Sequence, residues 1–222
     1  MNQSIILNIE GNIGCGKSTF IARLKEEFKD NCQVCILPEP VDQWLQIKDE
    51  SGNILQHYYK DQKRYAFAFQ MMAYISRLAI LKQAIEKGYK YIITERCLDT
   101  DKHIFCQMLY DDGFINEIEF QIYNKWFDEF ITKHEYKTIY LRCDPTIAYE
   151  RVQIRSRMEE TESISLDYLQ KCHLYHENWM KHIDILLIDA NVDMNMNPDT
   201  IQEWIQLVRR LIRITDMEFI DL

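Results

Sequence analysis

The sequence is poor in the two residues that most often interrupt regular structure, with only six glycines and four prolines among its 222 residues. It shows no low-complexity tract, internal repeat or Gly/Pro-rich linker. These absences exclude a string of flexibly joined modules and predict a compact, helix-rich chain. We therefore expect one domain over residues 1–222, an ordinary length for a single α/β unit.

Positive charge is scarce as well. The chain has 26 lysines and arginines against 35 aspartates and glutamates, and its net charge is −9. This balance argues against a surface that coats nucleic acid, because such a surface needs a basic face. A polyanionic ligand fits this composition only if the few cations gather around it.

Long apolar runs are missing too, and none approaches the ~18 residues that span a bilayer. The first residues lead directly into an apolar, strand-like segment, so we expect no signal peptide, transit peptide or membrane anchor. Seven cysteines are an odd number without regular spacing, which indicates reduced thiols and a cytoplasmic protein rather than a disulfide framework. Cys32 and Cys35 lack the second pair that a zinc site needs.

The first motif with a chemical meaning is a glycine-rich loop. It reads G-x-x-x-x-G-K-S from Gly11 to Ser18, after the apolar run Ile5–Ile9 and before a helical pattern over 18–29. Backbone N–H groups of such a loop surround phosphate oxygens, Lys17 neutralises the β- and γ-phosphates, and the Ser18 hydroxyl suits Mg²⁺. A purely structural glycine turn is the alternative. We expect a nucleoside-triphosphate site that uses Gly11, Asn12, Gly14, Cys15, Gly16, Lys17, Ser18 and Thr19.

Five strand patterns alternate with helical patterns along the chain. We predict strands at Ile5–Ile9, Gln33–Leu37, Tyr89–Thr94, Lys137–Arg142 and Ile183–Ile188. We predict helices over 18–29, 63–87, 117–133, 146–158, 166–181 and 198–214. This alternation is typical of a three-layer α/β fold, in which helices flank a parallel sheet on both faces.

Charged residues follow several strands at the point where ligands bind in such sheets. Glu39 follows the second strand, the pair Glu95-Arg96 follows the third, and Asp189 follows the fifth. Because parallel strands end at one edge of the sheet, we expect these side chains beside the phosphate loop.

The helix predicted over 63–87 is apolar nearly all round, which implies burial on more than one side, either in a thick core or against a second subunit. Yet Gln70, Ala73 and Arg77 share one face. A buried glutamine or arginine is costly without a partner. Either these side chains reach solvent at the edge of the helix, or they line a polar cavity in which Gln70 pairs with the edge of a nucleobase. We favour the cavity.

The segment from Arg151 to Glu162 is densely charged. A solvated helix face with i, i+4 ion pairs is one interpretation. However, Arg151 and Arg155 lie one turn apart and repel each other unless an anion sits between them. We favour a lid of about residues 151–162, whose arginines, including Arg157, close over a γ-phosphate.

Taken in order, these motifs resemble those of the deoxyribonucleoside kinases, the family of deoxycytidine, deoxyguanosine and mitochondrial thymidine kinases. The resemblance covers essentially the whole chain. It implies a P-loop kinase fold, ATP-dependent 5′-phosphorylation of deoxyribonucleosides in nucleotide salvage, and a homodimer, which we expect through the apolar helix. The matching elements are the phosphate loop, Glu39-Pro40-Val41 with Trp44, Phe69-Gln70, Ser76-Arg77, Glu95-Arg96, the arginine-rich segment and the run from His173 through His176-Glu177-Asn178-Trp179.

The resemblance also implies roles for single residues. Glu39 would take the proton of the 5′-hydroxyl, and Arg96 would hold that carboxylate and the transferring phosphate. Ser18 and Glu95 would hold Mg²⁺. The donor would further contact Arg151, Arg155, Arg157, Asp189, Asn191 and Asp193. The nucleoside would contact Trp44, Leu55, Tyr59, Phe69, Gln70, Ala73, Arg77, Asp101, Phe105 and Glu160.

Base preference depends on Ala73, Arg77 and Asp101. Members similar to deoxycytidine kinase likewise have a small residue, Arg and Asp there, whereas thymidine-accepting members lack the Arg–Asp pair. The pair offers hydrogen-bonding groups to an amino-bearing base and leaves little room for a thymine methyl. We therefore expect deoxycytidine and purine deoxynucleosides to be accepted and thymidine to be a poor substrate. One departure from the family is Cys97, which stands where a serine is usual.

Two alternatives remain open from the sequence. A nucleoside monophosphate kinase of the thymidylate kinase type shares the fold, the loop and the lid, but it must hold a second phosphate, which the Glu39 carboxylate would repel. A non-catalytic nucleotide-binding module is the other alternative. The N-K-x-D guanine motif of GTPases is absent from the sequence.

Overall fold

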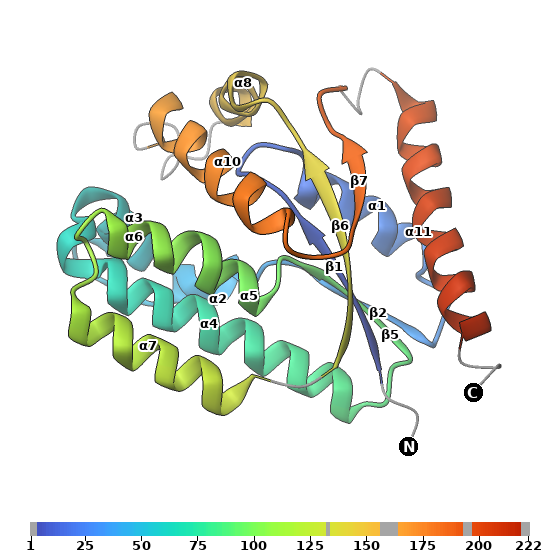
Figure 1. Ribbon diagram of the computed structural model, residues 1–222, viewed down its shortest axis with the longest axis horizontal. Helices are drawn as coiled ribbons and strands as arrows, with labels where there is room; N and C mark the ends of the chain where they lie inside the picture. Colours follow the sequence, from blue (N-terminus) through green and yellow to red (C-terminus); the bar gives the residue numbers. More distant parts are fainter. Residues whose placement is uncertain (1–3, 132–133, 156–163, 193–196, 219–222) are drawn as a thin grey trace.

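The computed structural model describes residues 4–131, 134–155, 164–192 and 197–218 (Figure 1). Its centre is a five-stranded sheet in the order β2-β5-β1-β6-β7, in which every pairing is parallel. The predicted parallel sheet is therefore confirmed. The strands are β1 (Ile5–Glu10), β2 (Val34–Leu37), β5 (Tyr91–Glu95), β6 (Glu135–Arg142) and β7 (Ile185–Asp189).

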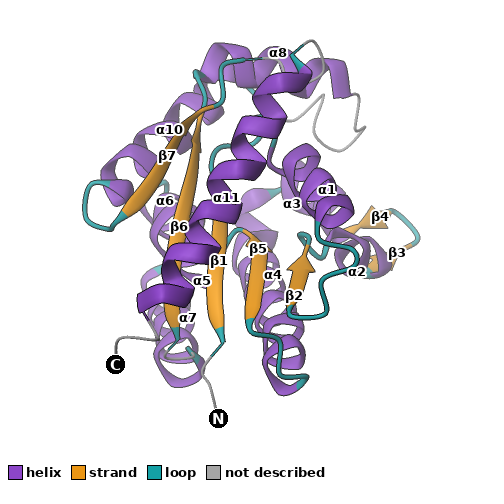
Figure 2. Ribbon diagram, turned by 90° about the vertical axis from the view of Figure 1, so that its right-hand side faces the viewer, coloured by secondary structure: helices purple, strands orange, loops and turns teal. Residues whose placement is uncertain are grey.

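One face of the sheet is covered by α1 (Lys17–Glu27) and α11 (Pro198–Glu218), which lie in front of the strands in Figure 2. Phe20 of α1 meets Trp204 of α11 edge to face, with ring centroids 5.5 Å apart. Alternate residues of β1, from Ile5 to Ile9, belong to this core. Because strand side chains alternate, Asn8 and Glu10 point to the opposite face.

The opposite face carries α4 (Gln62–Glu86), and α7 (Glu117–Phe130) packs against it; both lie behind the strands in Figure 2. Leu81 and Ala84 of α4 pack against Ile6 and Ile92 of the sheet. Next to α4 on this face lies a helical run of α5 (Leu98–Thr100), the π-helix η1 (Asp101–Cys106) and α6 (Gln107–Asp111), followed in space by α10 (Leu166–Met180).

Smaller elements surround the carboxyl ends of the strands. They are α2 (Val41–Gln46), the hairpin of β3 (Lys48–Asp49) and β4 (Gly52–Asn53), α3 (Ile54–Lys60) and α8 (Pro145–Arg155). Asn53 begins α3 with a capping box, because its side chain accepts from the Gln56 N–H and the Gln56 side chain accepts from the Asn53 N–H. These elements bring the chain after β2 over the edge of the sheet where the phosphate loop lies.

All of the predicted strands are present, and each predicted helix has a counterpart with small differences at its ends. The helix expected to end at 214 continues to Glu218, and the part of the helix expected over 156–158 lies outside the described residues. All seven cysteines are free, as expected for reduced thiols, and a cytoplasmic location stays a prediction. Within the described ranges, no helix is both long and apolar enough to cross a membrane.

Candidate active site

The phosphate loop joins β1 to α1 and is held by its neighbours. Gly14 has a left-handed φ of 81°, and a Cβ there would collide with the backbone of Ala148 in α8. Asn12 donates from Nδ2 to the Leu169 carbonyl in α10 (2.8 Å) and accepts from the Ile13 N–H (2.8 Å). Glycine is required where the loop touches α8, and Asn12 fixes the loop to α10.

Lys17 and Ser18, the two side chains of the loop with an expected chemical role, both have hydrogen-bond partners. Lys17 Nζ donates to the carbonyls of Gly11 (2.9 Å) and Asn12 (2.7 Å). The Ser18 hydroxyl donates to Glu95 Oε1 (2.7 Å). A hydroxyl and a carboxylate oxygen thus meet at the start of α1, and such hard oxygen ligands fit a Mg²⁺ that keeps most of its waters.

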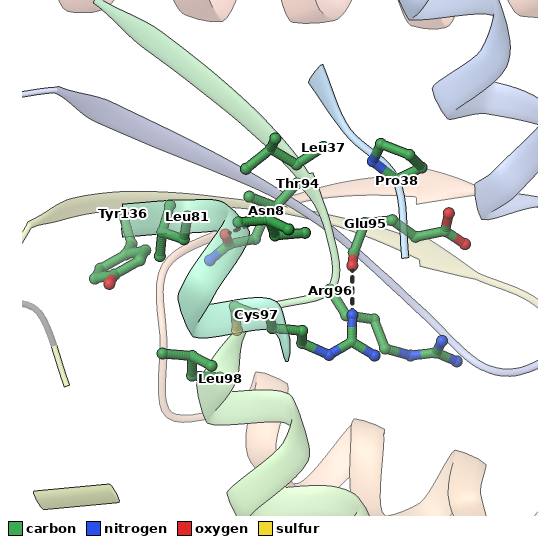
Figure 3. A pocket seen from close by; sticks show the side chains of 12 residues that line it. Asn8, Leu37, Pro38, Leu81, Thr94, Glu95, Arg96, Cys97, Leu98 and Tyr136 are labelled. Atoms are coloured by element: carbon green, nitrogen blue, oxygen red, sulfur yellow. Dashed lines mark hydrogen bonds between the residues drawn. The ribbon is translucent and has the colours of Figure 1, made fainter. Parts of the chain in front are cut away.

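Arg77 is the centre of a buried ion cluster. Its Nε donates to Asp101 Oδ2 (2.9 Å), its Nη2 pairs with Glu39 Oε1, and its Nη1 donates to the Glu95 carbonyl (3.0 Å), the bond drawn in Figure 3. Arg96 Nη1 donates to the same Glu39 oxygen (2.9 Å). The side chains of Arg77, Asp101 and Arg96 are each at most 7% exposed. Two arginines therefore hold Glu39, and one of them also holds Asp101.

The cluster controls the ionisation of its carboxylates. Burial alone would raise the pKa of Glu39, but the guanidinium groups of Arg96 and Arg77 outweigh it and hold the pKa at about 2. Burial raises the pKa of Asp101 to about 6, although Arg77 opposes this rise. Glu39 is therefore an anion at every pH at which the protein would be assayed.

A cavity of about 830 Å³ joins the loop to this cluster. One end contains the loop residues Gly14, Gly16, Lys17, Ser18 and Thr19 together with Arg151 and Arg155. The other end is largely aromatic, and Glu39, Glu95 and Arg96 lie between the two. The nucleoside-site residues predicted to line it and found there are Trp44, Leu55, Tyr59, Phe69, Gln70, Ala73, Arg77, Asp101 and Phe105.

The aromatic end has a defined shape. Trp44 donates from Nε1 to the Ser76 hydroxyl (2.9 Å) and meets Phe69 edge to face, while Tyr58 stacks on Phe69 with centroids 4.7 Å apart. Gln70 is only 2% exposed, and its Oε1 has no hydrogen-bond partner among the described residues. An amide on the wall of an aromatic slot can recognise a planar ligand that carries a donor group.

Some predicted residues make contacts that were not expected or lie away from the cavity lining. Arg151 reaches the rim of the cavity, but its guanidinium donates to the carbonyls of Ala190 (2.8 Å), Asn191 (3.1 Å) and Val192 (3.0 Å). Asp189 accepts from the Asn191 N–H (3.0 Å), so both residues shape the turn after β7. Through these contacts Arg151 stabilises that turn. Gly11, Asn12 and Cys15 are buried behind the cavity, and Arg157, Glu160 and Asp193 lie outside the described residues.

Other residues of the cavity were not predicted. Tyr58 and Tyr168 line it beside Tyr59, and the direct link from Arg77 to Glu39 was also missed. The capping box that begins at Asn53 could have revealed α3, the helix that carries Tyr58 and Tyr59. No local signal could have revealed an ion pair between positions 39 and 77, because it depends on how α4 crosses the end of β2.

A second cavity lies behind Glu95 and Arg96 (Figure 3). Its volume is about 20 Å³, which suffices for roughly one water molecule. Apart from the arginines and Glu95, its lining is mostly apolar and includes Leu37, Leu81 and Leu98. Its size excludes a substrate, so the large cavity is the candidate active site.

A parallel sheet with a phosphate loop after its first strand, facing an arginine-bound carboxylate across one cavity, defines a P-loop phosphotransferase. Residues 7–213 match the deoxynucleoside kinase family. The chain belongs to that family and is a deoxyribonucleoside kinase, so its donor is a nucleoside triphosphate.

Three relatives illustrate the similarity. A probable deoxycytidine kinase of Fowlpox virus (strain NVSL) is 37% identical over 177 residues, which cover 78% of this chain and 71% of the relative. Deoxycytidine kinase of Rattus norvegicus is 33% identical over 239 residues, covering 90% and 89%. Mitochondrial deoxyguanosine kinase of Xenopus laevis is 32% identical over 224 residues, covering 86% and 83%.

The ion cluster makes a prediction about stability. Because the pKa of Glu39 falls from 4.5 to about 2 on folding, its charge contributes to stability above pH 4.5 and loses this contribution as the pH falls through about 2. Glu39→Gln should therefore lower the free energy of unfolding at neutral pH by about 3 kcal/mol. The difference from the unmodified protein should narrow as the pH falls below 4.5, measured by urea unfolding.

Glu26→Gln is a matched control, because Glu26 forms an exposed pair with Lys29 that solvent screens. It should leave the unfolding midpoint almost unchanged. A Glu39→Gln protein as stable as the unmodified one at neutral pH would contradict the role given to the cluster.

Proposed function

We propose that this protein transfers the γ-phosphoryl group of ATP to the 5′-hydroxyl of deoxyribonucleosides and serves nucleotide salvage. The observation that carries the proposal is the Glu39 carboxylate, held by two arginines on the wall of the cavity that also contains the phosphate loop. A donor on the loop and a sugar alcohol in the aromatic half would meet beside Glu39. The similarity to deoxycytidine and deoxyguanosine kinases favours the same class of acceptor.

Glu39 would orient the attacking hydroxyl and accept its proton. Phosphoryl transfer passes through a loose transition state with little bonding to the nucleophile, so positioning and charge neutralisation contribute more than strong base catalysis. A carboxylate whose pKa is about 2 is a weak base, but two arginines aim it at one place. Its low pKa keeps it ready to accept a hydrogen bond at neutral pH.

The other charged residues would act on the phosphates. Lys17 and the loop N–H groups would hold the β- and γ-phosphates, and Arg96 would neutralise charge on the transferring group. Arg155 lines the same end of the cavity and would contribute from the side of the lid. Ser18 and Glu95 would hold Mg²⁺, which would neutralise part of the charge on the phosphates of the donor.

Base recognition would come from Gln70 with the Arg77–Asp101 pair. The free Oε1 of Gln70 can accept from an exocyclic amino group, and its amide nitrogen can donate to a ring acceptor. Asp101 and Arg77 line the same cavity as Ala73, and we expect them to occupy the space that a thymine methyl would need. We therefore infer that deoxycytidine and purine deoxynucleosides are good substrates and that thymidine is a poor one.

A nucleoside monophosphate kinase of the thymidylate kinase type is disfavoured by charge. Its acceptor carries a phosphate, which would lie against the ionised Glu39. Arg77 at that place is already paired with Glu39 and Asp101, and Arg96 is shared between Glu39 and the transferring phosphate, so no further cation of the described cluster is left for an acceptor phosphate.

An acceptor panel tests the proposal. With ATP and Mg²⁺, deoxycytidine, deoxyadenosine and deoxyguanosine should be phosphorylated, thymidine should be at least about tenfold poorer in kcat/KM, and dCMP should give no product. Formation of the 5′-monophosphate can be followed by chromatography. Turnover with dCMP alone would overturn the proposal in favour of a monophosphate kinase.

The base-recognition residues allow a second test. Arg77→Met combined with Asp101→Ala removes the pair without leaving one buried charge unmatched. It should raise the ratio of kcat/KM for thymidine to that for deoxycytidine by about tenfold or more. Because Arg77 also holds Glu39, kcat with both substrates should fall. Asp101→Asn, which keeps Arg77 and the volume of the site, is the control and should change the ratio less; an unchanged ratio in the double variant would contradict the assignment.

We also propose the homodimer, with an interface formed by α4 and α7. On α7 an exposed apolar stripe repeats every four residues through Ile118, Ile122, Trp126 and Phe130, and Ile75 is exposed on α4. The Tyr74 hydroxyl donates to the Trp126 carbonyl (3.4 Å), so the two helices form one surface. Such a stripe is typical of a surface that another protein covers.

Sedimentation equilibrium measures this directly. The unmodified protein should sediment as a dimer, and Ile122→Glu with Trp126→Glu should shift it to monomer, because charges would be buried in the interface. Leu174→Glu, at an exposed apolar residue of α10, should leave the dimer intact. A monomeric unmodified protein would exclude the interface.

A further inference from the structure

His176 is a buried histidine that the proposed mechanism does not use. It lies on α10, is fully buried, and stacks on Tyr140 of β6, with centroids 6.1 Å apart and planes 8° apart. Its ring also meets Phe105 edge on, with centroids 6.4 Å apart. The guanidinium of Arg96 lies over the same Phe105 ring, 5.1 Å from its centroid. His176 and Arg96 are therefore neighbours on one aromatic ring.

The tautomer of His176 follows from its one hydrogen bond. Nδ1 lies 2.7 Å from the Cys172 carbonyl oxygen, which can only accept, so Nδ1 carries the hydrogen and Nε2 presents a lone pair. Burial, together with the positive charge of Arg96, lowers the pKa of the imidazole to about 3. The ring is thus neutral and offers a single acceptor atom.

Several buried polar atoms in this region have no partner among the described residues. They include Nε2 of His176 and Nε of Arg96. Glu10 points to this face of the sheet and pairs in register with Tyr140, the residue on which His176 stacks. Burial raises the pKa of Glu10, and side-chain hydrogen bonds from Thr100 and Cys97 together with the charge of Arg96 oppose this rise only in part. Buried polar groups in native proteins are almost always bonded to protein or to ordered water.

We propose that His176 is a positioning residue for Arg96, joined to it by one bridging water. The water accepts from Arg96 Nε–H and donates to His176 Nε2 and to a carboxyl oxygen of Glu10, a set of three partners that is usual for buried water. The inference rests on the proposed function, in which Arg96 aims Glu39 at the acceptor. His176 belongs to the run from His173 to Trp179, which matches the family in sequence but has no part in the mechanism proposed above.

The backbone of Arg96 explains why it needs this support. Its φ of 63° is left-handed, which costs a non-glycine residue stability unless its surroundings hold it there. The Arg96 N–H donates to the Ile9 carbonyl (3.1 Å), and Nη1 is fixed on Glu39. Nη2 donates to the Gly11 carbonyl over a longer distance (3.5 Å). The proposed contact at Nε would add a fixed point on the opposite edge of the guanidinium.

Two amide substitutions separate positioning from local packing. His176→Gln places an acceptor near the position of Nε2, and His176→Asn places a donor near Nδ1, where it can keep the bond to the Cys172 carbonyl. Positioning through Nε2 predicts that the Asn variant loses about tenfold or more in kcat with little change in nucleoside KM, and that the Gln variant stays within about threefold of the unmodified enzyme. Equal losses in both variants, or no loss in the Asn variant, would overturn the proposal.

Nitrogen NMR of the imidazole gives a readout that does not depend on activity. In protein labelled at histidine, His176 should be neutral and protonated on Nδ1 across neutral and mildly acidic pH. Arg96→Lys removes the Nε–H donor and should shift the Nε2 resonance of His176. Arg142→Lys is the control, because Arg142 pairs with Glu177, the next residue on α10, and it should leave that resonance in place.

These outcomes keep the two proposals distinct. An Nε2 resonance that ignores Arg96→Lys, or a His176 protonated on Nε2, would overturn the link even if the enzyme phosphorylates nucleosides. A chain that phosphorylates no nucleoside but shows the shift would overturn the proposed function and support the link between His176 and Arg96.

Discussion

The buried guanidinium of Arg77 lies between two carboxylates, and the arrangement of the active site depends on this double ion pair. Asp101 binds its Nε, Glu39 binds its Nη2, and the backbone of Glu95 accepts from Nη1. An arginine buried on α4 would be very costly alone, and so would either carboxylate. Together they form one charge-balanced unit that holds α4, the end of β2 and the start of η1 in fixed relation.

This unit links base recognition to phosphoryl transfer. Asp101, Gln70 and Glu39 line one cavity, in which we propose that Asp101 and Gln70 face the base and Glu39 faces the transferring phosphate. Because Arg77 touches both carboxylates, a change at the base-binding end is felt at the catalytic end. The chain is acidic overall, so it can bind a polyanionic donor only where cations gather. Its buried arginines lie at the edge of the sheet that carries the phosphate loop.

The parts of the molecule set by local pattern could be predicted, and the parts set by the crossing of distant elements could not. The sheet, the loop from Gly11 to Ser18 and the shared face of Gln70 and Arg77 follow from periodicity and motif spacing. The π-helix at 101–106 has no clean period, so it was missed. The bonds from Arg151 to three carbonyls of the turn after β7 were not predicted, because no sequence pattern reports where such carbonyls will lie, and its expected role at the donor stays a prediction.

The most direct measurement is the rate of phosphoryl transfer by Glu39→Gln in a single turnover with ATP and deoxycytidine. The amide has the shape of the carboxylate but cannot take the proton or balance the two arginines. If Glu39 is the group that aims and deprotonates the hydroxyl, the rate should fall by roughly a hundredfold or more, while donor binding should change little. A rate equal to that of the unmodified enzyme would show that the arginine-held carboxylate does not drive the reaction.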